Sequence, residues 1–355
     1  MGLKIAVMGT GAVGGYAGAH MAQAGEDITF IDPWPEHVET MRAKGLRISH
    51  IRDVPEFTAK VRAMHLTDVQ QFVKEKPIDL AFVCVKSYDT AWATAFISQY
   101  LSPNGFVVSL QNCMNEETVA GVVGWGKTVG CIASSITVEL CEPGHVRRAA
   151  GKSGSRHTVF RAGEVHGRIT VRVQEVCRLV SLADSAMVTT NLWGERWSKL
   201  VTNAMANGIS ACTGLPSGEM VRNFALRRFA EKVGSEAIRV GQALGYQLEE
   251  INHLDPEIIA KAGEGDPEAA KFLEDRRLAE ANRPGGGGEH RPSMGQDMVK
   301  GRRTEIEFIN GLIARKGEEI GIRTPANVAL TDIVKRVERG ELKPDPRHLM
   351  EVRLD

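Results

Sequence analysis

A short apolar segment followed by a glycine-rich turn constrains this chain more than any other feature of its sequence. Residues 4–8 predict a strand, and residues 9–15 predict a tight turn into a helix that ends near Gly25. A second strand is expected at residues 28–31, with Asp32 at its end. This order of strand, G-x-G-x-x-G turn, helix, strand and acid is typical of dinucleotide-binding units.

Each glycine of the turn has a distinct expected role. Gly9 allows the tight turn, Gly11 lets the backbone approach a pyrophosphate, and Gly14 lets the helix pack closely on the strand. The unpaired N–H groups at the helix start favour phosphate binding. Asp32 would accept hydrogen bonds from the adenosine ribose and repel a 2′-phosphate, which favours NAD(H) over NADP(H). The turn also contributes three more residues to this predicted cofactor site: Thr10, Ala12 and Val13.

The first half of the chain alternates apolar strands with helical patterns. Continuous apolar runs at residues 80–85, 106–110 and 129–132 are typical of parallel strands covered on both faces. The alternation predicts an α/β Rossmann domain with a doubly wound, mostly parallel sheet. Lys86 and Asn112 lie just past two strand ends, so we expect them on the cofactor side.

From about residue 191 the pattern is almost wholly helical. We therefore expect a dinucleotide-binding domain over residues 1–188, a helical substrate and catalytic domain over 189–340, and a tail over 341–355. Residues 255–292 contain two Asp-Pro pairs and four consecutive glycines, and they predict a flexible insertion. A surface insertion without a role and a mobile lid both fit this segment.

Composition narrows the classes of partner and compartment. The 355-residue chain has a formal net charge of +0 and a pI near 7.2, so its overall charge gives no case for nucleic acid or an anionic membrane. No secretory signal and no apolar run approaching ~20 residues is visible. The six cysteines show neither C-x-x-C nor metal-ligand spacing. We expect a cytoplasmic protein without a metal site.

A polar stripe stands out in the helical half. Lys199, Asn203 and Asn207 are spaced i, i+4 and i+8 within a helix predicted over residues 193–207, so they would lie on one face. The same stripe would be ordinary on a solvent-exposed face.

The chain resembles the ketopantoate reductase (2-dehydropantoate 2-reductase) family over nearly all its length. The similar segments, in order, are residues 9–14, 83–86, 111–114, 197–207, 292–297 and 304–311. The resemblance implies a Rossmann domain followed by an all-α domain of the 6-phosphogluconate dehydrogenase C-terminal-like type. It also implies hydride transfer between a nicotinamide cofactor and a 2-oxo or 2-hydroxy acid such as ketopantoate or pantoate.

The resemblance implies roles for particular residues. Lys199 would be the general acid or base, because a lysine among apolar walls has a pKa lowered toward neutrality. Glu305 would orient the substrate and Lys199, and Lys86 would lie near the cofactor. The residues implied in substrate binding are Asn112, Asn203, Asn207 and Ser293, and Asn112 would also orient the nicotinamide. Two structural readings remain open: a solvated acid at a helix start for Glu305 and a helix N-cap for Ser293.

Three features depart from the family pattern. No basic residue follows Asp32 over residues 33–36, whereas the family commonly uses NADPH. Cys113 replaces a glycine, and the 255–292 insertion is present. A dehydrogenase of another hydroxy acid or hydroxyketone therefore stays open as an alternative. An opine-type dehydrogenase fits the 193–207 helix less well, and a non-catalytic dinucleotide sensor would not need the catalytic set. We expect a small-molecule substrate as partner, and the helical half would allow a homodimer.

Overall fold

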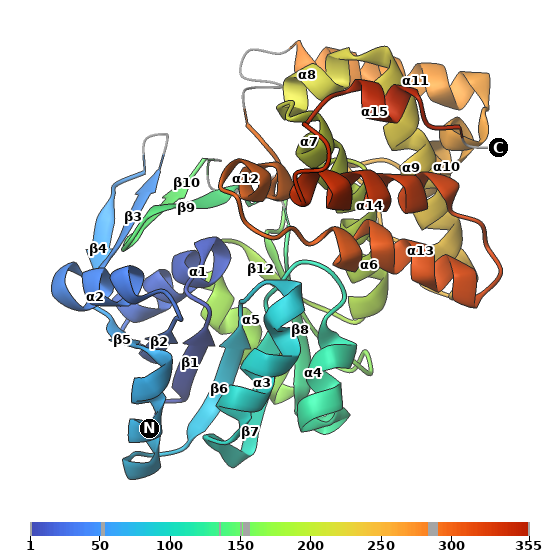
Figure 1. Cartoon of the computed structure of the whole chain (residues 1–355). Coiled ribbons are helices and arrows are strands. Elements are labelled where there is room, and N and C mark those ends of the chain that lie inside the picture. The colour runs from blue at the N-terminus through green and yellow to red at the C-terminus, as the bar shows by residue number, and fades with distance from the viewer. Residues whose placement is uncertain are drawn as a thin grey trace. The chain divides into compact units, whose positions relative to one another are not determined.

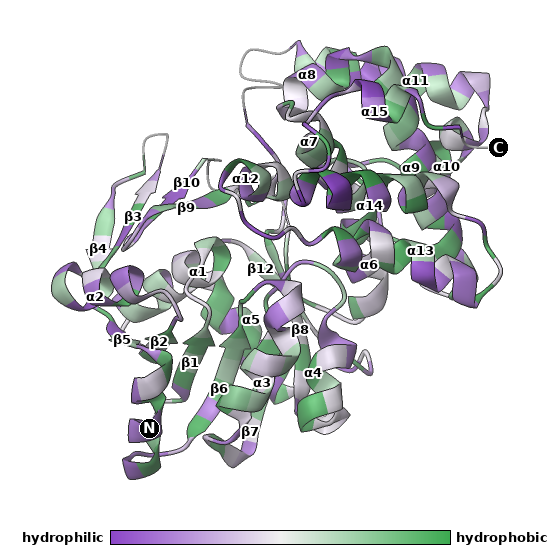
Figure 2. Cartoon of the chain, viewed as in Figure 1, coloured by the Kyte–Doolittle hydropathy of each residue, from purple (hydrophilic) through white to green (hydrophobic). Residues whose placement is uncertain are grey.

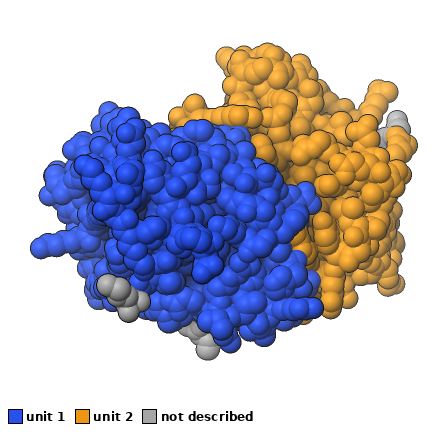
Figure 3. Space-filling model, turned by 90° about the horizontal axis from the view of Figure 1, so that it is seen from below, with its two compact units in different colours: residues 1–192 blue, residues 193–355 orange. Residues whose placement is uncertain are grey.

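The chain forms two compact units. The computed structural model describes residues 2–50, 54–134, 136–149, 151, 157–282 and 290–353. Contacts divide the chain into a unit of residues 1–192 and a unit of residues 193–355, coloured separately in Figure 3.

The first unit is built on an eight-stranded sheet. Its strands are β1 (Lys4–Met8), β2 (Asp27–Ile31), β5 (Arg62–Met64), β6 (Ile78–Val83), β7 (Leu101–Ser109), β8 (Thr128–Ala133), β11 (Phe160–Glu164) and β12 (Ala186–Thr189). Their order is β12-β11-β8-β7-β6-β1-β2-β5, and every neighbouring pair is parallel except β8 and β11. The predicted doubly wound, mostly parallel sheet is confirmed.

Helices cover both faces of this sheet, which explains the continuous apolar runs. Alternate β1 residues Ile5 and Val7 join a core with α1 (Ala12–Gln23) and α5 (Val171–Ser181). The intervening Ala6 and Met8 join a second core. The helices of that second core include α3 (Thr90–Ser98) and α4 (Glu116–Val123), which lie together on one face in Figure 1. Figure 2 shows hydrophobic residues concentrated in the central strands. A strand buried on both faces cannot alternate apolar with polar residues.

A second, four-stranded sheet covers α1 and was not expected from the sequence. Its order is β4-β3-β10-β9, with bounds β3 (Leu46–His50), β4 (Phe57–Ala59), β9 (Val138–Glu142) and β10 (His145–Arg148). A Cβ placed on Gly15 of α1 would lie 3.1 Å from Val146 Cγ2. The buried Arg148 of β10 pairs with Asp184 at 2.5 Å and donates a hydrogen bond to Tyr16 of α1 at 2.9 Å. The helix that follows the glycine turn is therefore held on both sides.

Short helices complete the first unit. They are α2 (Pro35–Lys44) and the 3-10 helices η1 (Leu66–Lys74), η2 (Ser87–Asp89) and η3 (Trp125–Lys127).

The second unit is all-α, as expected. Its helices are α6 (Leu192–Ala204), α7 (Asn207–Thr213), α8 (Ser217–Arg222), α9 (Phe224–Ala243), α10 (Pro256–Glu264), α11 (Pro267–Ala281), α12 (Ser293–Val299), η4 (Ile306–Phe308), α13 (Asn310–Glu319), α14 (Pro325–Glu338) and α15 (Arg347–Met350). The long α9 packs against α10, α13, α14 and α15. The expected tail belongs to this unit, because Leu349 is buried and the Asp345 N–H donates to the Cys212 carbonyl at 2.9 Å.

The expectation of a flexible insertion over 255–292 is wrong for residues 256–281. That stretch forms α10 and α11, each begun by an Asp-Pro pair in which the aspartate caps the helix. Asp255 accepts a hydrogen bond from the Glu257 N–H at 2.8 Å, and Asp266 accepts one from the Glu268 N–H at 2.9 Å. A Cβ on Gly263 would lie 2.4 Å from the Glu231 carbonyl oxygen, so α10 packs directly on α9. The four-glycine run lies outside the described residues.

The helix predicted over 193–207 is also corrected. It ends at Ala204, and Asn207 is the first residue of α7. Lys199 and Asn203 thus share one helix, whereas Asn207 starts the next. No helix in the described ranges is long and apolar enough to cross a membrane.

Candidate active site

The glycine turn has the geometry that its sequence predicts. Gly9 has a positive φ of 89°, and a Cβ there would lie 2.9 Å from the Val85 nitrogen. A Cβ on Gly14 would lie 2.5 Å from the Gly9 carbonyl oxygen and 2.7 Å from Cys84 Cβ. No atom comes within 4 Å of a Cβ built on Gly11. Glycine is required at the first and third positions by packing, and the second position keeps the open space that a pyrophosphate needs.

Asp32 is fixed beside this turn. Its Oδ2 accepts a hydrogen bond from the Thr10 N–H at 2.7 Å, and its Oδ1 accepts one from the Trp34 N–H at 2.9 Å. The buried His37 accepts from the Gly144 N–H through Nδ1 and donates from Nε2 to the Thr10 carbonyl, both at 2.9 Å. Burial lowers the pKa of His37, which suits this neutral tautomer. Each Asp32 oxygen retains acceptor capacity for a ribose hydroxyl.

Lys86 and Asn112 lie in loops after β6 and β7, and two amides missed from the sequence join these loops. Gln111 Nε2 donates to the Val85 carbonyl at 2.8 Å. Asn115 Nδ2 donates to the Asn112 carbonyl at 2.7 Å and to Ser87 Oγ at 3.2 Å. Polar residues directly after an apolar strand were the available signal. The turn after β1, Asp32 after β2 and these two loops all follow carboxyl ends of parallel strands, where dinucleotides bind.

Cys113 occupies a backbone conformation suited to glycine. Its φ is 67°, and its side chain is only 4% exposed. A non-glycine residue in this region costs roughly 1 kcal/mol or more and persists where its surroundings hold it. The loop after β7 therefore keeps a glycine-like course while carrying a buried thiol.

Lys199 lies half-buried on a rigidly packed helix. Burial lowers its pKa from 10.5 to about 8. The Trp197 turn of α6 packs closely against α9. Trp197 Nε1 donates a hydrogen bond to the Ala237 carbonyl at 2.8 Å, and a Cβ built on Gly241 would lie 2.3 Å from Trp197 Nε1. The neighbouring Leu200 is fully buried. The apolar surroundings expected of a lysine with a depressed pKa are present.

The structure brings Asn207 and Ser293 together. Ser293 Oγ donates to Asn207 Oδ1 at 3.2 Å, and the Met294 N–H approaches the same oxygen at 3.5 Å. Ser293 is the first residue of α12 and Pro292 is its N-cap, so the N-cap reading of Ser293 is wrong. A Cβ on Gly295 would lie 2.4 Å from Ser210 Oγ, so α12 packs closely on α7.

Asn203 presents a buried donor. Its side chain is 9% exposed, and Nδ2 has no hydrogen-bond partner among the described residues. A buried polar group without a partner is costly unless a ligand or water satisfies it. This amide is suited to donate to an oxygen of a bound molecule.

Glu305 is buried, with 5% of its surface exposed, so the reading as a solvated helix-start acid is wrong. It directly precedes η4, and its carbonyl accepts hydrogen bonds from the Phe308 and Ile309 N–H groups at 2.9 and 3.1 Å. Glu307, two residues later, is half-buried and pairs with Lys335 at 2.8 Å.

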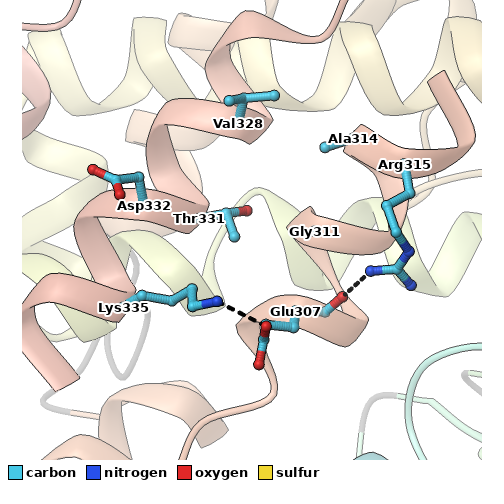
Figure 4. Close-up of a pocket in the computed structure, with 8 residues that line it drawn as sticks. All are labelled: Glu307, Gly311, Ala314, Arg315, Val328, Thr331, Asp332 and Lys335. Carbon is cyan, nitrogen blue, oxygen red and sulfur yellow. Dashed lines mark hydrogen bonds and ion pairs between the residues drawn. The ribbon is translucent and has the colours of Figure 1, made fainter. Parts of the chain in front are cut away.

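Glu307 lines a separate surface groove of about 320 Å³, in which Lys335 points toward its carboxylate and Arg315 toward its carbonyl (Figure 4). The groove is lined by Glu307, Gly311, Ala314, Arg315, Val328, Thr331, Asp332 and Lys335. None of the sequence-predicted site residues lines it. Within the described parts of the chain, no group of three or more His, Cys, Asp or Glu side chains could hold a metal ion.

Two features define the class of protein. A glycine turn and an acid lie at the point where the strand order of a doubly wound sheet reverses, which is the dinucleotide site of such folds. A lysine with a pKa near 8 is suited to exchange a proton with an oxygen during reduction or oxidation. The molecule has the fold and the groups of a nicotinamide-dependent oxidoreductase.

Comparison with known families makes the assignment specific. The family model described as "Ketopantoate reductase PanE/ApbA" matches residues 5–158, and "Ketopantoate reductase PanE/ApbA C terminal" matches residues 191–338. The chain belongs to the ketopantoate reductase family, and it is an oxidoreductase acting on CH–OH groups with a nicotinamide cofactor.

Relatives match over nearly their whole length. The 2-dehydropantoate 2-reductase of Archaeoglobus fulgidus is 31% identical over 347 residues, covering 95% of this chain and 98% of that protein. A PanE/ApbA family ketopantoate reductase from Ralstonia eutropha JMP134 is 28% identical, with a TM-score of 0.76 and coverage of 96% and 99% of the two chains. D-mandelate dehydrogenase, solved with NADH and anilino(oxo)acetate, shares the fold at 23% identity and a TM-score of 0.77, with 95% and 99% covered.

Proposed function

We propose that this protein reduces a branched 2-oxo acid of the ketopantoate type, with Lys199 as the proton donor. The observation that carries the proposal is Lys199 itself, half-buried with a pKa of about 8, in the same unit as the buried Asn203, Asn207 and Glu305. A bound reduced nicotinamide supplies hydride to the carbonyl carbon. The ammonium of Lys199 gives one proton to the carbonyl oxygen, which leaves an alcohol and a neutral amine. In the reverse direction the neutral amine accepts that proton.

The substrate contacts come from groups whose hydrogen-bonding capacity suits an oxygen-rich ligand. The Nδ2 group of Asn203 donates to the substrate hydroxyl, and Asn207 shares that hydroxyl from the start of α7. Ser293, already bonded to Asn207, turns its hydroxyl toward the substrate carboxylate when substrate binds. Asn112 orients the substrate from the loop after β7.

Glu305 serves as an acceptor that orients Lys199 and the substrate hydroxyl. A carboxylate that is 5% exposed would be strongly disfavoured without partners, so its burial fits a group that contacts a cation or hydroxyl. The backbone bonds from Phe308 and Ile309 to its carbonyl hold this segment in a defined turn.

NADH is the proposed cofactor in preference to NADPH. The buried Asp32 carboxylate lies against the glycine turn, and its negative charge would oppose a 2′-phosphate. Residues 33–36 contain no lysine or arginine, and Arg42 is engaged by Glu39 and Asp68. A higher kcat/KM with NADPH than with NADH would overturn this choice.

A second candidate is a dehydrogenase of another 2-hydroxy acid that uses the same catalytic set. Cys113, buried in the loop after Asn112, favours it, because its side chain adds volume beside Asn112 while the loop keeps a glycine-like course. D-mandelate dehydrogenase, solved with NADH, has a similar fold, which supports this candidate. We further propose a cytoplasmic protein and a homodimer; a dimeric ketopantoate reductase from Staphylococcus aureus shares the fold.

The test follows absorbance of the reduced cofactor with ketopantoate as substrate and NADH and NADPH in parallel. Rapid turnover with NADH supports both the substrate and the cofactor. Binding of NADH without turnover of ketopantoate would overturn the substrate, and oxidation of a panel of 2-hydroxy acids with NAD would then decide for the second candidate.

A further inference from the structure

The break between α6 and α7 falls between two of the proposed substrate-binding residues. α6 ends at Ala204, immediately after Asn203, and α7 begins at Asn207. The Ala206 N–H bonds to the Asn203 carbonyl three residues back, at 3.2 Å, instead of continuing the α-helical pattern. The position of this break therefore sets where both asparagines point.

A buried amide on another helix holds the end of α6. Asn310, the first residue of α13, is fully buried, and its Nδ2 donates to the Ala204 carbonyl at 3.3 Å and to Asn327 Oδ1 at 2.9 Å. The last carbonyls of a helix lack partners within the helix, so a side-chain donor is needed where the helix end is buried.

Asn310 is itself anchored deep in the unit. Asn327, near the start of α14, is fully buried and donates from Nδ2 to Glu236 Oε2 of α9 at 2.8 Å. Glu236 also accepts hydrogen bonds from the Ala326 and Asn327 N–H groups at 2.9 and 3.0 Å. A carboxylate at a helix N-terminus is favourably placed, so Glu236 holds Asn327 in a fixed position.

Asn310 also directly follows the segment that carries Glu305. The Ile309 N–H donates to the Glu305 carbonyl at 3.1 Å, and Asn310 follows directly. A Cβ built on Gly208 of α7 would lie 3.0 Å from Leu330 Cδ2 of α14 and 3.1 Å from Ile306 Cδ1 of η4. These three helices are therefore in close contact around Gly208. Asn310 thus joins the Asn203–Asn207 break to the Glu305 turn.

We infer that Asn310 is a positioning residue for substrate specificity: by holding the Ala204 carbonyl it places Asn203 and Asn207 for the substrate hydroxyl, relative to Glu305. This inference rests on the proposed function. Without Asn310 the buried carbonyl loses its donor, and α6 and α7 can shift toward a continuous helix. Recognition of the hydroxyl suffers more than reduction of the carbonyl.

The test compares ketopantoate with 3-methyl-2-oxobutanoate, which lacks the hydroxyl-bearing carbon. In Asn310→Ala, kcat/KM for ketopantoate falls at least tenfold, mainly through KM, and the ratio of kcat/KM values for the two acids falls at least fivefold. In an Asn203→Ala background the same change has no further effect on the ratio. Asn223→Ala is the matched control, since it removes an asparagine that caps α9 through the Leu226 N–H and leaves the ratio unchanged.

An unchanged ratio in Asn310→Ala, with losses equal for both acids, would overturn the inference. If the alanine variant fails to fold, Asn310→Ser replaces it, because serine keeps a hydrogen-bond donor on a shorter side chain. The serine variant should lower the ratio of kcat/KM values for the two acids by a smaller factor. Amide hydrogen exchange gives a readout independent of substrate: exchange across residues 204–208 rises at least tenfold in the Asn310 variant but not in Asn223→Ala. If the wild type reduces neither acid, the proposed function fails, whereas unchanged exchange at 204–208 refutes the positioning role itself.

Discussion

The low pKa of Lys199 predicts that this residue lowers the free energy of unfolding of the protein at neutral pH. Its pKa of about 8 lies well below the ordinary 10.5, and each pH unit of that difference corresponds to about 1.4 kcal/mol, so burial of the ammonium costs about 3–4 kcal/mol. Below pH 8 the lysine is charged in both the folded and unfolded states, and the folded state bears the full cost. Between pH 8 and 10.5 the folded protein has released a proton that the unfolded chain retains, so stability rises with pH.

Lys199→Met tests this trade-off, because methionine fills an apolar site with little loss of volume and no charge. At pH 7 the free energy of unfolding of the cofactor-free variant should exceed that of the wild type by up to about 3–4 kcal/mol, and the gap should shrink as pH approaches 10.5. Reduction by the same variant should fall by about 10²–10⁴-fold.

Urea unfolding at pH 7 and pH 10, followed by tryptophan fluorescence, measures both stabilities; Trp193 and Trp197 lie on the same helix as Lys199. Lys335→Met is the matched control, since Lys335 is half-buried at the surface groove and pairs with Glu307, and it should change stability by less than about 1 kcal/mol at either pH. A Lys199→Met variant that is less stable than the wild type at pH 7, or a difference that does not vary with pH, would refute the reasoning.

Single contacts determine the expected effects of three further substitutions. Glu305→Gln should lower kcat by about 10²-fold or more, whereas Glu307→Gln, whose carboxylate pairs with Lys335 at the surface groove, should change it less than about twofold; equal losses would remove Glu305 from the site. Asp32→Ser should raise the NADPH-to-NADH ratio of kcat/KM by about tenfold, equivalent to about 1.4 kcal/mol, and an unchanged ratio would show that another group selects the cofactor. Gly14→Ala should abolish NADH binding measured by calorimetry, because its Cβ would lie 2.5 Å from the Gly9 carbonyl oxygen, and retained affinity would contradict that packing.

The dinucleotide unit was predictable because its determinants are local. Gly9 needs a positive φ, Gly14 needs close contact with Cys84, and Asp32 must follow the second strand; all three requirements are visible in the order of residues. The continuous apolar runs likewise report burial on both faces of the sheet.

The break after Ala204 was not predictable from its own residues. Residues 204–207 contain neither glycine nor proline, so local propensity favours a continuous helix. The helix ends there because distant groups, Asn310 above all, satisfy the carbonyl at its end. The second sheet over α1 and the amide contacts of Gln111 and Asn115 are likewise long-range features that leave no pattern in a short window.

The two helices of the 256–281 segment have a local signal in the sequence. Asp255-Pro256 and Asp266-Pro267 are each an N-cap followed by proline at the first helical position, a pair of signals for helix starts rather than for a flexible insertion. The nearby run of four glycines favours a loop only for its own residues, so it does not extend to these helices.

The most direct test of the central claim is the pH dependence of kcat for reduction of ketopantoate by NADH in the wild type and in Lys199→Ala. If Lys199 donates the proton, kcat is constant below about pH 8 and falls about tenfold per pH unit above it, while the variant loses about 10²–10⁴-fold with its affinity for NADH intact. Turnover that survives in Lys199→Ala, with the same pH profile as the wild type, would contradict the account.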